Sequence, residues 1–151
     1  CHVCLLRPKS RGAVTLASAD PMAAPLIDPN FLGEIDDLET MVAGFKLTRR
    51  IMEAPALKSQ ATSEMFSAGV ESDDEIRDFL RRRVDTVYHP VGTCMMGPDP
   101  NSAVVDAQLR VHGLEGLRVV DASIMPTLIG GNTNAPTMMI GEKAADLIRA
   151  A

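Results

Sequence analysis

Tryptophan is absent from this sequence, aromatic residues make up only 3% of it, and acidic residues outnumber basic ones by 20 to 15. The net charge of -5 offers no basic surface to a phosphate backbone, so nucleic acid is not an expected partner. No apolar run approaches the roughly 20 residues that cross a bilayer, and the first residues lack the apolar core of a signal peptide. With 46% hydrophobic residues, the composition predicts a globular protein without a transmembrane segment.

Cysteine is also scarce, which argues against a disulfide-stabilised secreted domain. Cys1, Cys4 and Cys94 form an odd, widely spaced set that is typical of a reducing compartment. Cys1 and Cys4 have the spacing of metal ligands, but a zinc site needs four, and Cys94 and His112 are distant candidates for the others. We interpret the pair as chance and predict no metal site. The expected location is the cytoplasm, with peripheral attachment to the inner membrane as a variant.

Local patterns in the first half predict one strand and two helices. The strand covers residues 11–18, and the proline-rich residues after it are expected to form a loop. The first helix begins at Asp36 and ends before Pro55, with a buried stripe of Leu38, Met41, Val42, Phe45 and Ile51. After an irregular stretch over 57–69, Ser72 and Glu75 form a capping box for a helix that buries Ile76, Phe79, Leu80 and Val84.

The second half is predicted to contain a small sheet and a final helix. Residues 104–105, 109–111 and 117–120 have the pattern of short strands, and residues 126–134 that of a loop. The final helix covers 135–150. The predicted fold class is therefore α+β, with helices packed on an antiparallel sheet.

Residues 88–97, YHPVGTCMMG, place one imidazole on a constrained turn. Pro90 disfavours helical geometry at His89, and glycines on the same segment allow backbone to approach a flat ligand. A histidine before proline is more often a structural residue than a catalyst, so the segment alone leaves the role of His89 open.

Residues 117–127, LRVVDASIMPT, end a predicted strand with a carboxylate. Strand ends are where α/β enzymes hold ligands, so Asp121 could accept hydrogen bonds from ligand hydroxyls. Capping of the following turn at Ser123 is at least as common a role for such a residue. The sequence leaves both roles open.

Residues 130–149 join a glycine pair to a helix that has Pro136 in its first turn. Backbone amides at a helix start stabilise negative charge, and the side chains of Asn132 and Asn134 add neutral donors there. Asn134 could instead be a simple N-cap.

These three segments, in this order, resemble the signature regions of the glucose-methanol-choline (GMC) oxidoreductases. Residues 6–21 and 27–32 are similar to a strand and loop of that family's substrate domain, so the resemblance covers nearly the whole chain. Asn132, together with residues 125–136, resembles the choline dehydrogenase and acceptor-linked alcohol dehydrogenase branches, and is closer to the latter.

The resemblance implies an FAD-dependent enzyme that oxidises an alcohol to an aldehyde by hydride transfer to flavin N5. His89 is then the catalytic base that accepts the hydroxyl proton, and Asn132 is the second catalytic residue, which donates a hydrogen bond to the same oxygen. The positions expected around the cofactor are Asp121, Ala122, Asn132, Asn134, Pro136 and Thr137. The expected partners are a small-molecule alcohol and a quinone or another electron acceptor.

The resemblance also implies a division into a substrate-binding portion, 1–113, and a return into the FAD-binding domain, 114–151, made of one strand and the final helix. The family's G-x-G-x-x-G fingerprint does not occur in these residues. We therefore interpret the chain as a C-terminal fragment that is inactive alone. Its uncovered apolar surface, over 117–120 and the final helix, predicts self-association. The alternative is a binding module that has kept the scaffold without the chemistry.

Overall fold

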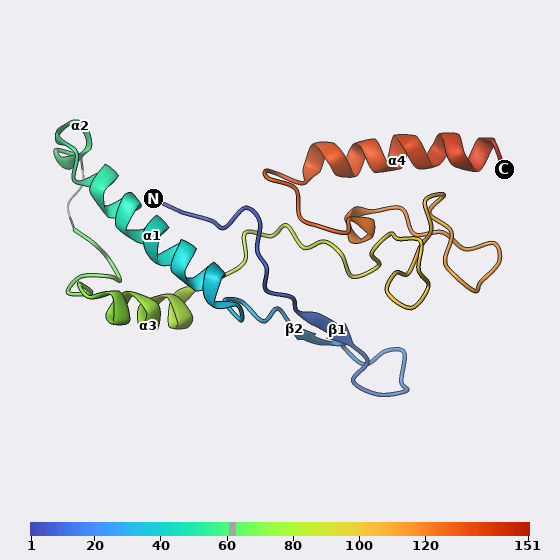
Figure 1. The fold of residues 1–151 in the computed structure, drawn as a ribbon, viewed down its shortest axis with the longest axis horizontal. Helices are drawn as coiled ribbons and strands as arrows, with labels where there is room; N and C mark the ends of the chain where they lie inside the picture. The colour runs from blue at the N-terminus through green and yellow to red at the C-terminus, as the bar shows by residue number, and fades with distance from the viewer. Residues whose placement is uncertain (61–62) are drawn as a thin grey trace. The chain divides into compact units, whose positions relative to one another are not determined.

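The computed structural model describes residues 1–60 and 63–151, and these divide into two compact units (Figure 1). The first unit is Cys1–Val87 and the second is Tyr88–Ala151. Each unit has its own cluster of buried apolar side chains. The division into 1–113 and 114–151 concerns the domains of a longer enzyme, and it stays a prediction.

A hairpin of two short strands lies in the first unit. β1 (Ala13–Thr15) pairs antiparallel with β2 (Leu26–Asp28), with Val14 opposite Ile27. The first strand was predicted, but the expectation of a loop at β2 is wrong, because pairing with β1 holds the three residues between Pro25 and Pro29 extended. Both strands are exposed along their whole length.

The described residues of the first unit also contain three helices: α1 (Ile35–Met52), α2 (Pro55–Lys58) and α3 (Asp73–Arg83). α1 and α3 pack through a core of apolar side chains, namely Leu38, Met41, Val42, Ile76 and Leu80. The rings of Phe45 and Phe79 meet edge to face beside that core, with centroids 5.7 Å apart. Ile51 was expected in the buried stripe but is exposed, and α2 was not predicted. α1 ends at Met52, and Pro55 is the first residue of α2, a position where the backbone N–H has no partner within the helix and its absence is tolerated.

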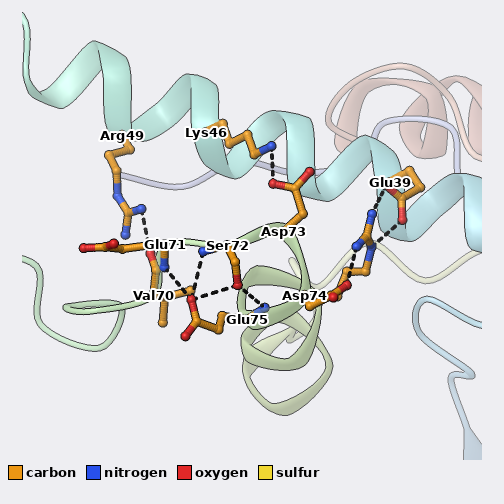
Figure 2. Close-up of polar contacts among 10 residues, drawn as sticks. Glu39, Lys46, Arg49, Val70, Glu71, Ser72, Asp73, Asp74 and Glu75 are labelled. Atoms are coloured by element: carbon orange, nitrogen blue, oxygen red, sulfur yellow. Dashed lines mark hydrogen bonds and ion pairs between the residues drawn. The ribbon is translucent and has the colours of Figure 1, made fainter.

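Polar contacts connect α1 and α3 along their length (Figure 2). The Arg77 guanidinium donates to both carboxylate oxygens of Glu39, at 2.7 and 2.9 Å, and these bonds hold the pKa of Glu39 below its ordinary value. Lys46 pairs with Asp73 at the other end of the contact. The predicted capping box is confirmed, since the Ser72 and Glu75 side chains each bond to the backbone N–H of the other.

A buried carboxylate attaches the N-terminal segment to α1. Asp37 is only 3% exposed, and it accepts hydrogen bonds from the backbone N–H groups of Lys9 and Ser10 and from the Ser10 hydroxyl at 2.5 to 3.0 Å. Burial alone would raise the pKa of the Asp37 carboxyl, but these hydrogen bonds outweigh burial and hold the pKa below its ordinary value. Asp37 therefore acts as a charged anchor for residues 9 and 10.

The second unit consists of bridged turns, one 3₁₀ turn and a long helix. The strands expected within 104–120 are present only as single-residue bridges, Val105 with Met96 and Val111, and Arg110 with Arg118. Turns between these bridges prevent longer strands from forming, and Leu109, beside one of the turns, has φ 65°. The 3₁₀ turn is η1 (Ala122–Ile124), and the predicted final helix is confirmed as α4 (Asn134–Arg149). The core between them contains Val105, Leu109, Ile124, Met125, Ile140 and Ala144.

Candidate active site

The loop of residues 88–97, which we call the histidine loop, is held by backbone hydrogen bonds to η1. Cys94 donates its N–H to the carbonyl oxygen of Ser123 at 3.0 Å, and Met96 donates to that of Ile124 at 2.8 Å. Val91 packs against the core of the second unit. These contacts fix the residues that follow His89, whose side chain is half-buried.

Two backbone conformations in the histidine loop are unusual. Tyr88, directly before His89, has φ 61°, a value that bulky residues seldom adopt and that is often found at functional sites. Gly92 has φ +88°, and a Cβ placed on it would lie 3.4 Å from the carbonyl oxygen of Met125. The glycine therefore gives the loop a turn and a close approach to the residue that follows η1.

Asp121 takes the capping role that the sequence left open. Its Oδ1 accepts hydrogen bonds from the N–H of Ser123 at 2.8 Å and from the Ser123 hydroxyl at 2.5 Å. Ala122, another expected cofactor position, lies half-buried inside η1.

The amino end of α4 is suited to an anion. The N-cap is Thr133 and not Asn134, the Thr133 side chain makes no capping bond, and the first turn contains no acidic residue. Pro136 occupies the first turn without an N–H, while Thr137 donates its N–H and hydroxyl to the Thr133 carbonyl at 3.0 and 2.7 Å. The partial positive charge of this helix end is therefore not neutralised within its own first turn. Asn132 and Asn134 are exposed there.

The structure brings the three sequence segments into one unit. Val91 of the histidine loop, Ala122 of η1 and Ile129 of the loop before α4 all pack against the same apolar core. His89 and Asn132 lie two and three residues from these packed positions. A direct meeting of the imidazole with the carboxamide stays a prediction.

The sequence indicated Ser123 only as part of a capped turn, and it did not indicate that Ser123 bonds to the histidine loop or that Gly92 approaches Met125. The Asp121-Ala122-Ser123 spacing is a known turn signal, but its connection to Cys94 crosses between distant segments and has no local signature. His112, once considered as a metal ligand, places Nε2 3.0 Å from the carbonyl oxygen of Gly97. In the described part of the chain, no three His, Cys, Asp or Glu side chains are grouped as metal ligands. None of the helices described is long and apolar enough to cross a bilayer.

Comparison with known proteins gives one consistent result. A family model described as GMC oxidoreductase, for the C-terminal domain, matches residues 8–141. The chain is 55% identical over 148 residues to an alcohol dehydrogenase (acceptor) of Pseudomonas putida, covering 97% of this chain and 27% of that protein. It is 52% identical over 151 residues to an oxygen-dependent choline dehydrogenase of Klebsiella pneumoniae, covering 99% of this chain and 27% of that protein.

Solved structures agree with these sequence relationships. Pyridoxine 4-oxidase from Mesorbium loti superimposes with a TM-score of 0.89 at 36% identity, over 97% of this chain and 28% of its own. Aspergillus oryzae formate oxidase, a protein studied for the modification of its FAD, gives 0.91 at 35% identity, over 97% of this chain and 26% of its own. The chain thus spans about a quarter of the length of these relatives.

Proposed function

Because the chain belongs to the GMC oxidoreductase family, we propose that it is the C-terminal catalytic portion of an FAD-dependent enzyme that oxidises an alcohol to an aldehyde. The observation that carries this proposal is the anchoring of the His89, Asp121 and Asn132 segments on one core, beside the unneutralised amino end of α4. The names of the relatives favour choline or another small alcohol as substrate, with oxygen, a quinone or another compound as the final electron acceptor.

The residues at the start of α4 fit a flavin that gains negative charge during reduction. The absence of acidic side chains in the first turn and the lack of a side-chain cap leave the first backbone amides available to an anion. Asn132, Asn134, Pro136 and Thr137 are the residues of this end that would hold the ring system. Asp121, the N-cap of η1, and Ala122 would contact the cofactor from the other segment. When bound, FAD supplies the acceptor for the hydride that leaves the alcohol carbon.

The roles of the two catalytic residues follow from the needs of the alcohol. A neutral alcohol is a poor hydride donor, so its hydroxyl proton must be removed as the hydride leaves. His89 in its neutral form accepts that proton, and the resulting imidazolium stabilises the developing alkoxide. The Asn132 carboxamide donates a second hydrogen bond to the same oxygen. The carbonyl of the aldehyde forms as the C–H and O–H bonds break.

The test uses the full-length enzyme that contains this chain. His89→Ala is expected to slow anaerobic bleaching of the flavin by the alcohol by about 10² to 10⁴-fold, the usual contribution of a general base. His2→Ala is the matched control, because His2 is exposed in the first unit and is expected to leave the rate unchanged. Flavin reduction at the wild-type rate in His89→Ala would refute the assigned base. A full-length protein that binds no flavin would favour the non-catalytic module instead.

A further inference from the structure

We propose that Ser123 is a positioning residue for His89, a role that rests on the proposed function of the histidine loop. Ser123 lies half-buried at the centre of η1, and its two sides face different partners. Its N–H and hydroxyl donate to Oδ1 of Asp121, at 2.8 and 2.5 Å. Its carbonyl oxygen accepts the N–H of Cys94 at 3.0 Å. One residue thus connects the carboxylate that stabilises the turn to the loop that presents the base.

The contact between η1 and the histidine loop has three consecutive points. The carbonyl oxygens of Ser123 and Ile124 accept the N–H groups of Cys94 and Met96, and the carbonyl oxygen of Met125 lies against Gly92. A rotation of the η1 backbone moves all three carbonyl oxygens together, because they belong to successive residues of one tight turn. The orientation of η1 therefore sets the position of residues 92–96, and through them that of His89.

Asp121 determines that orientation from outside the core. Ile124 and Met125 are buried and fix the end of the turn, whereas its beginning is held by the two hydrogen bonds from Ser123 to Asp121 Oδ1. Loss of the hydroxyl removes one of these bonds and leaves the other, so Ser123→Ala should loosen η1 without unfolding it. Because Ser123 acts through the loop, its effect is expected on the chemical step and not on substrate binding.

Hydrogen exchange of the full-length enzyme, read by mass spectrometry over residues 91–97, measures this connection directly. Ser123→Ala is expected to speed exchange in that segment about fivefold, as for one lost hydrogen bond, and Asp121→Ala by more. The same Ser123→Ala enzyme is expected to lose about fivefold in kcat at nearly constant KM. Ser123→Thr keeps the hydroxyl and should restore both values.

Ser102 provides a matched control in the same unit. Ser102 lies three residues after Asp99 in a turn, and its hydroxyl is 3.3 Å from Asp99 Oδ2. Residues 99–102 of this turn make no hydrogen bond to residues 91–96, all of which are described by the structure. Ser102→Ala should therefore leave exchange over 91–97 unchanged. The proposal is overturned if exchange in that segment is the same in Ser123→Ala and the wild type, or if Ser102→Ala raises it equally. If Ser123→Ala speeds hydrogen exchange over 91–97 but the His89→Ala enzyme reduces its flavin at the wild-type rate, the proposed function is refuted and the positioning role of Ser123 in the loop is not.

Discussion

Replacement of Asp37 by alanine should release the N-terminal segment from the first unit. Trypsin cleaves after lysine, and the Lys9–Ser10 bond lies between the two backbone N–H groups that Asp37 holds. In the wild type this bond must open locally before a protease can reach it, so the cleavage rate reports the free energy of opening. The assay is limited trypsinolysis of the full-length enzyme, with the new terminus at Ser10 quantified by mass spectrometry.

The expected magnitude follows from the contacts of the carboxylate. Hydrogen bonds to a charged group contribute about 1.5 to 3 kcal/mol each but do not add, and alanine leaves two backbone donors without an acceptor in a site where Asp37 is only 3% exposed. A loss of about 3 kcal/mol corresponds to cleavage about 150-fold faster.

The neighbouring carboxylate is the control for this experiment. Asp36 pairs with the ammonium group of Lys9 at 2.5 Å, and the side chains of Asp36 and Lys9 are 64% and 66% exposed. Surface pairs of this kind contribute about 0 to 1 kcal/mol, so Asp36→Ala should accelerate cleavage by about fivefold at most. Equal cleavage rates in Asp37→Ala and Asp36→Ala would refute the anchoring role of Asp37.

Acid should weaken the same anchor, and the sign follows from the direction of the pKa shift. The folded pKa of Asp37 lies below its unfolded value, so the stabilisation is complete above the unfolded pKa and is lost as pH falls through the folded one. We therefore compare the protection of the Ser10 amide from hydrogen exchange in the wild type and in Asp37→Ala. The ratio of the two protection factors should be constant from neutral pH down to about pH 4, and it should fall only below that pH.

Two further variants test local features. Ser72→Ala removes the confirmed capping box and should destabilise α3 by about 1 kcal/mol, seen as faster hydrogen exchange over residues 73–77, whereas an unchanged rate would contradict the role of the cap. Gly92→Ala should cost about 1 to 2 kcal/mol through its positive φ, and it should also lower kcat because relief of that strain shifts the histidine loop next to the Met125 carbonyl oxygen. Gly113→Ala is the control, because Gly113 also has a positive φ but faces open space outside the histidine loop. An equal loss of kcat in Gly113→Ala and Gly92→Ala would contradict displacement of the histidine loop as the cause.

The helices could be predicted because their signals are local. The capping box at Ser72 and Glu75 lies within four residues, and the spacing of Leu38, Met41 and Val42 reports one face of α1. Asp37 shows where local reasoning ends. As a member of the acidic first turn it is typical of a solvated helix start, yet residues 9 and 10 bury it, and nothing near position 37 indicates their approach.

Strands were harder to predict because pairing is decided by distant partners. Leu26 to Asp28 forms a strand only because β1 lies beside it, and two flanking prolines concealed it. Residues 117–120 have a strand pattern, but they form only one bridge, Arg118 with Arg110, which is flanked by backbone hydrogen bonds of Leu117 and Val119. In the candidate site, the motifs identified the segments around His89, Asp121 and Asn132 but assigned them to different portions, 1–113 and 114–151. The connection from Ser123 to Cys94 joins residues far apart in sequence, so no local pattern indicates it.

The boundary at Val87 and Tyr88 has a consequence for engineering and for evolution. Both proposed catalytic residues and every expected cofactor position lie downstream of it, in one uninterrupted stretch of 88–151. A single crossover there would transfer all of these positions between homologues in one piece, while the helices of the recipient's preceding unit stay intact. Chimaeras joined at this point therefore offer a direct way to test whether residues 88–151 carry the proposed chemistry with them.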